Sequence, residues 1–449
     1  MIGHHADGRG LLGSSGHAQY AHDMDSTLAC LERWMPRQRW YSSKGTTPRL
    51  RLLGDLGMAS TDPAALVRVL IVVDESANPA VTYQVPLVER RTPPSPPDHV
   101  IGTTPDGRTL VDGPSDAAYT DALVREVAPH LSGAEASVLT GEQSNTSIIF
   151  RAADADPVIC KVFRQLHPGI NPDIELQSAL ASAGSVHVPR AVGDLQGRWQ
   201  DRSDPRATCQ GALAFAQEFL PGVEDAWRVA LRAAHNDETF AAPAHALGAA
   251  TADVHLNLAR LFPTVPSDRA ARDSAAAAWR RRLGIAISEV PALQRHREAI
   301  SRVYDRALGT VWPPMQRIHG DYHLGQVLHV PARGWVLLDF EGEPMRPISE
   351  RLRPDSALRD VAGMLRSFDY VAGSLGSHEA PSRLETWAQQ SRDAFLGGYE
   401  HRSGQPATGP LLDAFELDKA VYEAIYESRN RPDWLPIPLA AIDRLVSPA

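Results

Sequence analysis

The chain has 449 residues, of which 43% are hydrophobic and 22% are charged, and its formal net charge is −9. This composition is typical of a globular protein, and the length exceeds one ordinary hydrophobic core, so we expect two or three packed units. The acidic balance excludes a nucleic acid or an anionic membrane as the main partner, because both require a basic surface. Small neutral or cationic ligands fit better, and no protein partner is implied.

The cysteines indicate the compartment. Cys30, Cys160 and Cys209 form an odd and scattered set, which indicates neither a disulfide framework nor a zinc site and predicts a reducing, cytoplasmic environment. No run of 18 apolar residues occurs and the first residues carry no signal-peptide pattern, so we expect no membrane span. Residues 1–25 are expected to form a flexible N-terminal arm.

A cap subdomain is predicted for residues 26–110. It begins with a short amphipathic helix that ends before Pro36. The β-branched runs at residues 66–73 and 81–88 predict two antiparallel strands. Residues 90–97 are rich in proline, which predicts an extended surface connection.

A nucleotide-binding lobe is predicted for residues 111–220. Two short runs of strand-forming residues flank a polar turn that contains Ser144, Asn145 and Thr146. Polar side chains and backbone amides in such a turn are suited to cradle phosphate. The turn has a single glycine, so it is a weak nucleotide signal by itself.

The same lobe contains a lysine within an apolar strand at residues 159–163. A lysine in such a strand usually reaches solvent from a sheet edge, but Lys161 is also placed as a phosphate-binding lysine would be. Asn171 then caps a helix whose first turn carries Glu175. The downstream motif described next favours the phosphate-binding role of Lys161, with Glu175 as its ion-pair partner.

The strongest chemical signal is the stretch of residues 318–344, in which a histidine- and carboxylate-rich loop runs into an apolar strand that ends in carboxylates. Its pattern is HGDxHxxQ, twelve intervening residues, and DxE, formed by His319, Asp321, His323, Gln326, Asp339 and Glu341. Phosphoryl transfer requires a carboxylate beside the attacking hydroxyl and oxygen ligands that hold magnesium against the triphosphate. The stretch therefore predicts a kinase catalytic loop followed by a metal-binding strand end.

Residues 221–449 are predicted to form a helical C-terminal lobe. Residues 244–262 have the spacing of an amphipathic helix, on which we expect His255 to be exposed or to cap rather than to act in catalysis. A last helix is predicted at residues 418–430. The helix and the segment after it carry the aromatic and charged residues typical of a sugar site, namely Tyr422, Glu423, Tyr426, Glu427, Arg431, Asp433 and Trp434. The alternative is a terminal helix whose glutamates face water and whose Trp434 fills the core, and the residue chemistry alone leaves both open.

The motif resembles that of the aminoglycoside phosphotransferase and choline kinase branch of the protein-kinase-like fold. The longer strings HGDYHLGQVL and DFEGEP resemble the maltokinase group of actinobacteria, in which Gln replaces the usual Asn of the loop. Similar segments recur along the chain: WMPRQRW in the cap, the pattern KxFRxLxPGxNPDxE, and YExxYExRNRPxWLPIP at the C-terminus. The resemblance implies an α+β, bilobal protein-kinase-like fold with an N-terminal cap.

The resemblance also implies roles for individual residues. Asp321 would orient the sugar hydroxyl and accept its proton, and His319 and His323 would brace that loop. Gln326, Asp339 and Glu341 would hold Mg2+. Asp360 would brace the catalytic loop. ATP would be held by Lys161, Glu175, the turn residues Ser144, Asn145 and Thr146, and the hinge residues Gln217, Glu218 and Phe219. The sugar site would consist of Asp321, Tyr322, His323 and the seven C-terminal residues named above.

The sugar itself is less strongly indicated. The maltokinase cap usually continues with an aromatic residue and GGKG, whereas this chain has Tyr41 followed by SSKG. The related actinobacterial glucosamine kinases fit the remaining motifs equally well, and the carboxylates of the last helix suit a cationic amino sugar. We therefore expect conversion of glucosamine to glucosamine 6-phosphate, with production of maltose 1-phosphate, aminoglycoside phosphorylation and a non-catalytic sugar or nucleotide sensor as alternatives.

Overall fold

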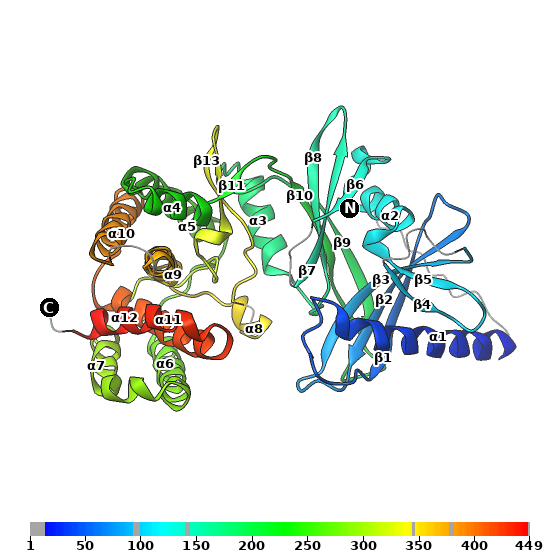
Figure 1. Cartoon of the computed structure of the whole chain (residues 1–449), viewed down its shortest axis with the longest axis horizontal. Coiled ribbons are helices and arrows are strands. Elements are labelled where there is room, and N and C mark those ends of the chain that lie inside the picture. The colour runs from blue at the N-terminus through cyan, green and yellow to red at the C-terminus, as the bar shows by residue number, and fades with distance from the viewer. Residues whose placement is uncertain (1–13, 93–98, 140–143, 344–345, 377–380, 448–449) are drawn as a thin grey trace. The chain divides into compact units, whose positions relative to one another are not determined.

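The computed structural model describes residues 14–92, 99–139, 144–343, 346–376 and 381–447. The chain forms two compact units. The first unit comprises residues 1–171 and 192–219, and the second comprises residues 172–191 and 220–449 (Figure 1). Each unit is described by itself.

The first unit begins with the helix α1 (Ser14–Trp34) and an antiparallel sheet. The sheet has the order β1-β2-β3-β5-β4 and consists of β1 (Leu50–Met58), β2 (Ala65–Asp74), β3 (Val81–Arg90), β4 (Val100–Thr103) and β5 (Thr109–Asp112). β2 and β3 pair over their full length, which confirms the two strands predicted from the β-branched runs. Leu31 and Trp34 of α1 pack with sheet residues such as Leu70 and Val85 in one buried core.

A second five-stranded sheet completes the first unit. Its order is β6-β7-β8-β10-β9, from β6 (Glu135–Val138), β7 (Asn145–Ala152), β8 (Ala155–Phe163), β9 (Ala191–Gln200) and β10 (Thr208–Glu218), with α2 (Ala117–Val127) beside it (Figure 1). The side chain of Gln84, on β3, donates hydrogen bonds to the carbonyl oxygens of Phe163 at 2.8 Å and Leu213 at 2.9 Å. Gln84 is fully buried, so it links the two sheets by pairing carbonyls that would otherwise be buried without partners.

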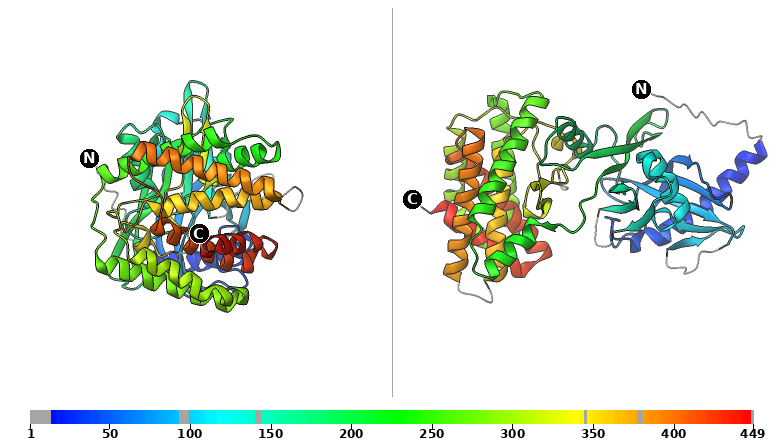
Figure 2. Two further views of the ribbon diagram at one scale, coloured as in Figure 1. Left: turned by 90° about the vertical axis from the view of Figure 1, so that its left-hand side faces the viewer. Right: turned by 90° about the horizontal axis from the view of Figure 1, so that it is seen from above.

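The second unit is mainly helical. Its helices are α3 (Pro172–Ser182), α4 (Ala226–His235), α5 (Ala241–Leu261), α6 (Arg269–Glu289), α7 (Arg297–Leu308), α8 (Ile348–Arg351), α9 (Leu358–Leu375), α10 (Pro381–Ser403), α11 (Pro410–Asn430) and α12 (Pro436–Val446). A small antiparallel sheet contains β11 (Glu224–Asp225), β12 (Val327–Val330) and β13 (Gly334–Leu337). In Figure 2, the orange helix α10 runs alongside the green helix α5. One apolar core, built from alanine, leucine and aromatic side chains, joins these helices, except α8, to the small sheet.

The predicted α+β architecture is confirmed, but some boundaries differ. α1 begins at Ser14, so residues 14–25 are helical rather than part of an arm. Residues 172–191, expected in the nucleotide-binding lobe, belong to the compact second unit. Most of the proline-rich connection lies outside the described residues, as do residues 140–143 of the expected phosphate-binding turn.

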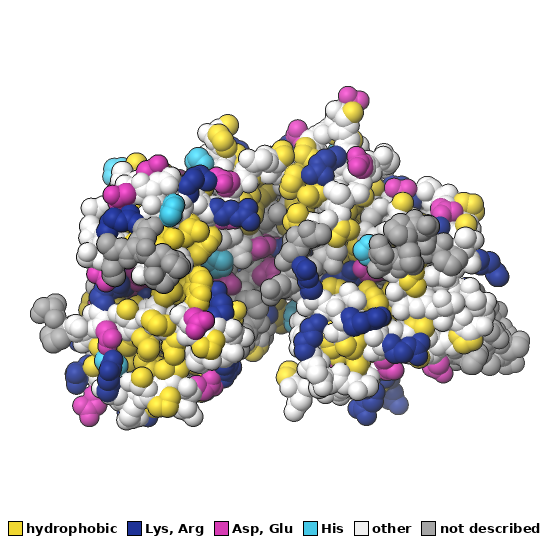
Figure 3. All heavy atoms as spheres, in the orientation of Figure 1, with side chains coloured by type: hydrophobic (Ala, Val, Ile, Leu, Met, Phe, Trp, Pro, Cys, Tyr) yellow, Lys and Arg dark blue, Asp and Glu magenta, His cyan; other side chains and the backbone are white. Residues whose placement is uncertain are grey.

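The surface carries charges of both signs. On the face drawn in Figure 3, basic and acidic side chains alternate with apolar ones instead of gathering in one basic field. Among the helices of the described segments, none is long and apolar enough to cross a membrane.

Candidate functional site

The predicted catalytic loop and the predicted metal-binding strand end are brought together by a tight hairpin. The loop ends in the 3-10 turn η5 (Leu324–Gln326), which leads directly into β12, and Gly334 turns the chain into β13 with a φ of +78°. A positive φ at this turn favours glycine because it lacks a Cβ. The backbone N–H of Leu338 donates to the carbonyl of Gln326 at 2.9 Å, so the segment before Asp339 is fastened to the end of the loop.

A buried carboxylate on α9 holds the loop in place. Asp360 is 1% exposed and accepts hydrogen bonds from the backbone N–H groups of His319 and Gly320, both at 2.8 Å. It also contacts Nε2 of His255 at 2.9 Å. Burial acts against ionisation, but the hydrogen bond and charge of His255, together with the other donors, outweigh it and hold the pKa of Asp360 below its usual range. The expected bracing role of Asp360 is confirmed.

The sequence pattern did not indicate that His255 belongs to the hydrogen-bonded group around Asp360. It is buried rather than exposed, and its ring bridges Asp360 and the Tyr399 hydroxyl, which lies 3.0 Å from Nδ1. A polar residue on an amphipathic helix is usually solvated. His255 departs from this pattern because Asp360, 105 residues later in the chain, supplies a buried partner.

The two loop histidines have different surroundings. Nε2 of His319 donates to the carbonyl of Leu338 at 2.7 Å, while Nδ1 accepts from the backbone N–H of Asp321 at 3.4 Å. His319 therefore ties the strand end to the loop that carries Asp321. His323 is half-buried and accepts a hydrogen bond from Gly325, and burial lowers its pKa against the opposing effect of Asp321. Tyr322 is buried and lies 2.8 Å from the hydroxyl of Thr251, so it anchors the loop to α5.

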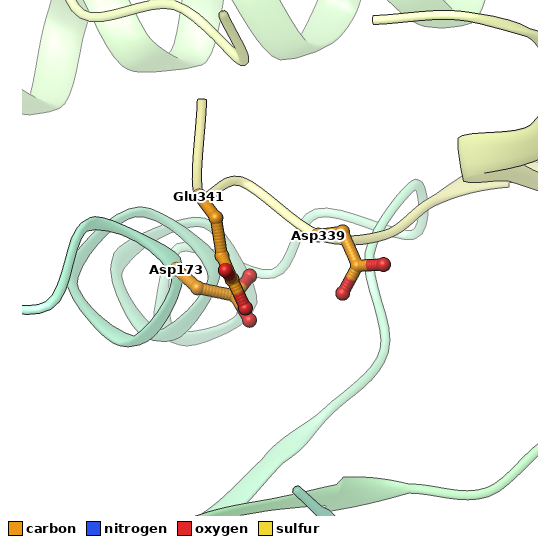
Figure 4. Close-up of side chains that lie close together, drawn as sticks. All are labelled: Asp173, Asp339 and Glu341. Atoms are coloured by element: carbon orange, nitrogen blue, oxygen red, sulfur yellow. The ribbon is translucent and has the colours of Figure 1, made fainter. Parts of the chain in front are cut away.

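Three carboxylates gather at the strand end. Asp173, Asp339 and Glu341 each place an oxygen within 4.8 Å of the other two (Figure 4). In Figure 4, Asp173 extends from α3 and its carboxylate lies against that of Glu341, while Asp339 approaches from the other side. Carboxylate oxygens are the ligands that Mg2+ prefers, so the donor set fits this ion.

The backbone at this cluster is strained. Asp339 has a φ of +60°, a left-handed conformation that costs a non-glycine residue about 1–3 kcal/mol. The next residue, Phe340, donates its backbone N–H to Oδ1 of Asp173 at 2.8 Å. This hydrogen bond connects segments 167 residues apart and helps to hold the strained turn in the conformation that directs the Asp339 carboxylate to the cluster.

Asp173 was not among the predicted metal ligands. The sequence feature that contains Asp173 is the NPDxE string, in which it follows Asn171 and Pro172 in the first turn of α3. A short acidic residue there usually serves the helix terminus. Only the fold brings it to Asp339. Gln326 is the last residue of η5, and the ligand role of its side chain stays a prediction.

The predicted nucleotide residues of the first unit lie on adjacent strands. Lys161 on β8 is half-buried and aligns with Ser147 on β7 and Phe215 on β10. Asn145 and Thr146 begin β7, Ser144 directly precedes them, and Oγ1 of Thr146 accepts from Arg164 at 2.9 Å. Gln217 and Glu218 end β10, and the backbone N–H of Phe219 donates to the carbonyl of Pro157 at 2.9 Å.

Glu175 belongs to the second unit and pairs there with Arg317, so its partnership with Lys161 stays a prediction.

The predicted sugar residues separate into two groups on α11 and beyond. Glu423 is buried and accepts from Arg366 at 2.8 Å, while Glu427 is 1% exposed and accepts from Arg431 and Tyr370. Burial raises the pKa of Glu423, and Arg366 opposes that rise. Both glutamates are thus held in internal hydrogen bonds and ion pairs.

The second group is more accessible. Tyr426 is 41% exposed, Asp433 is exposed, and Trp434 is half-buried. The guanidinium of Arg431 lies 5.4 Å from the ring centre of Tyr426 and 4.7 Å from that of Trp434. It therefore covers part of the aromatic surface that was expected to stack on a sugar.

Asp321 and Tyr422 are connected by a residue that the sequence patterns did not single out. Nζ of Lys419 lies 3.5 Å from Oδ1 of Asp321 and 5.2 Å from the ring centre of Tyr422. Asp321 itself is half-buried, with its side chain 25% exposed. The Asp321 carboxylate, which the motif predicts to face the acceptor hydroxyl, thus lies beside a cation at the edge of the predicted sugar region.

Comparison with known proteins agrees with this geometry. A relative, the glucosamine kinase of Mycolicibacterium smegmatis, is 29% identical over 332 residues, covering 69% of this chain and 79% of that protein. The glucosamine kinase of Streptacidiphilus jiangxiensis is 27% identical over 403 residues, covering 80% of this chain and 84% of that protein.

A solved glucosamine kinase in complex with glucosamine, ADP and inorganic phosphate has the same fold. It superposes with a TM-score of 0.65 at 22% identity, covering 93% of this chain and 99% of that one. The maltokinase N-terminal cap domain model matches residues 34–116, and the phosphotransferase enzyme family model matches residues 135–409. Since the second match alone covers more than half of the sequence, this chain belongs to the phosphotransferase enzyme family.

Proposed function

We propose that the protein is an ATP- and magnesium-dependent sugar kinase that transfers the γ-phosphate of ATP to glucosamine. The observation that carries the proposal is the Asp360-braced loop, which holds Asp321 on the hairpin that also ends in the Asp339 and Glu341 carboxylates. Family membership supports phosphotransfer, and the two relatives named glucosamine kinase support the acceptor.

Each group in the second unit then has a task. Asp321 orients the acceptor hydroxyl and receives its proton, which is the role of the carboxylate in the catalytic loop of kinases. His319 and His323 keep the loop in the conformation that this requires. Asp173, Asp339 and Glu341, with Gln326, would hold Mg2+, which neutralises charge on the triphosphate when bound. Most of the rate enhancement is expected from positioning and electrostatic stabilisation.

The nucleotide is assigned to the first unit. Lys161 would bind the α- and β-phosphates, Ser144, Asn145 and Thr146 would contribute polar groups near the phosphates, and the backbone of Gln217, Glu218 and Phe219 would read adenine. Glu175 is proposed to orient Lys161. Because the described cysteines are free thiols and ATP is a cytoplasmic substrate, we place the activity in the cytoplasm.

The acceptor hydroxyl is proposed to be the one on carbon 6, since a primary hydroxyl on a rotatable arm can reach Asp321 with little steric hindrance. Tyr422, Tyr426 and Trp434 would surround the ring, and Asp433 offers an exposed carboxylate to the ammonium group. Tyr322, which is buried and paired with Thr251, would support the loop from behind instead of contacting the sugar. Glu423, paired with Arg366, and Glu427, paired with Arg431, would shape this region.

Maltose is the second candidate, favoured by the match to the maltokinase cap domain. The test is a panel of initial rates with ATP, Mg2+ and either glucosamine, maltose, glucose, an aminoglycoside or no acceptor. The proposal predicts the highest kcat/KM with glucosamine. A higher kcat/KM with maltose would reassign the acceptor. If none of the acceptors supports ATP turnover, the proposal of a sugar kinase is wrong.

A further inference from the structure

Lys419 occupies a place beside the proposed catalytic carboxylate. It lies on α11, its side chain is 22% exposed, and its ammonium is 2.7 Å from Oε1 of Glu343 and 3.5 Å from Oδ1 of Asp321. Burial acts against its charge, but Glu343 and then Asp321 outweigh burial and raise the pKa of Lys419. Lys419 is therefore charged at neutral pH.

The charged groups around Lys419 have other ion-pair partners. Glu343 is 4% exposed and has a second cationic partner, Arg359, at 3.3 Å. The other nearby cation, Arg282, is paired with Asp418. Lys419, Arg282 and Arg359 line one small cavity with Glu343 and Asp418. In the described part of the chain, only Lys419 of these three cations lies within ion-pair distance of Asp321.

From this geometry we infer that Lys419 is a positioning residue that keeps the Asp321 carboxylate directed at the acceptor hydroxyl. The inference rests on the proposed function, in which Asp321 receives the hydroxyl proton. Glu343 fixes the ammonium through the shorter contact, and the ammonium in turn restricts the rotation of the Asp321 side chain.

A purely structural role for Lys419 predicts a loss of stability on its removal, whereas the inferred role predicts a loss of turnover alone. Glu343 retains Arg359 when Lys419 is removed, so Lys419→Met should leave the buried carboxylate with a partner and the unit folded. The loss should then appear in turnover and not in stability. Lys419→Arg retains the charge and should restore most of the activity.

The experiment compares wild type, Lys419→Met and Lys419→Arg. Arg429→Met serves as the control, because Arg429 is an exposed cation on the same helix that pairs with Glu289. The readouts are kcat, KM for ATP and for glucosamine, and the unfolding midpoint.

We expect Lys419→Met to lower kcat by roughly ten- to a hundredfold, the effect of losing one charge-assisted contact, with KM for ATP and the unfolding midpoint nearly unchanged. Wild-type turnover in Lys419→Met would overturn the inference. So would a loss that follows the unfolding midpoint and is not rescued by Lys419→Arg. If wild type itself does not phosphorylate glucosamine, the proposed acceptor fails instead, and the same series is run with the sugar that is turned over.

Discussion

Substituting Asp360 by Asn should damage both stability and turnover. The carboxylate accepts from two buried backbone N–H groups, with Oδ1 facing Gly320 and Oδ2 facing His319 and His255. An amide has one accepting oxygen, so whichever way the side chain lies, its NH2 group faces a backbone N–H that then lacks an acceptor.

The magnitude follows from these contacts. A buried unsatisfied N–H costs about 1–3 kcal/mol, and the change from charge-assisted to neutral hydrogen bonds adds about 1 kcal/mol. The sum is about 3 kcal/mol, which lowers the melting temperature of a unit of this size by roughly 6–12 °C. The loop that carries Asp321 should become mobile, so kcat should fall by at least roughly tenfold.

Thermal unfolding followed by circular dichroism, together with initial rates of ADP release, measures both effects. Asp393→Asn is the matched control, because Asp393 is exposed on α10 and its carboxylate accepts only from Gln389 among the hydrogen bonds found in the described residues. If Asp360→Asn has the same melting temperature and the same kcat as this control, the carboxylate does not hold the loop and the reasoning about its hydrogen bonds is wrong.

Four further predictions concern the chemistry and its environment. Asp321→Asn should abolish turnover while ATP affinity, measured by calorimetry, changes less than threefold, because the carboxylate acts on the acceptor; activity within tenfold of wild type would remove it from the mechanism. Asp173→Asn should raise the Mg2+ concentration needed for half-maximal rate by roughly tenfold, and an unchanged Mg2+ titration would exclude Asp173 as a ligand. Because the pKa of Asp360 is lowered from its ordinary value of 3.8, its contribution to stability is complete above that value and is lost as the pH falls through the folded pKa. Melting temperatures measured from pH 6 to pH 2.5 should therefore decline less steeply in Asp360→Asn than in wild type below pH 4, and parallel curves would contradict this. Finally, Asp433→Asn should raise KM for glucosamine by roughly tenfold and leave KM for glucose nearly unchanged; equal effects on both sugars would mean that Asp433 does not contact the ammonium.

The local parts of the site were predictable from sequence. The spacing from Asp321 to Asp339 spans one hairpin, whose strand residues and turn glycine are both visible in the chain, so the pattern predicted the strand end and its carboxylates. Asp360 was also expected from its place in a recognisable segment. These predictions succeeded because backbone geometry over short distances follows from residue type.

The features that the sequence did not reveal depend on contacts between distant segments. Asp173 reaches the carboxylate cluster through a hydrogen bond across 167 residues, and His255 is buried because Asp360 meets it. The spacing of Glu423 and Glu427 indicated two carboxylates on one helix, but it carried no sign that Arg366 and Arg431 would pair with them. A helical pattern tells which face a residue lies on and leaves open which element packs there.

The central claim is the transfer of phosphate from ATP to glucosamine, and product identification by NMR tests it most directly. Enzyme, ATP, Mg2+ and glucosamine labelled with carbon-13 should yield ADP and a single sugar phosphate whose phosphorus couples to carbon 6. Asp321→Asn under the same conditions should yield no product. A phosphorus signal at carbon 1 of maltose in a parallel reaction, with glucosamine left unchanged, would contradict the account.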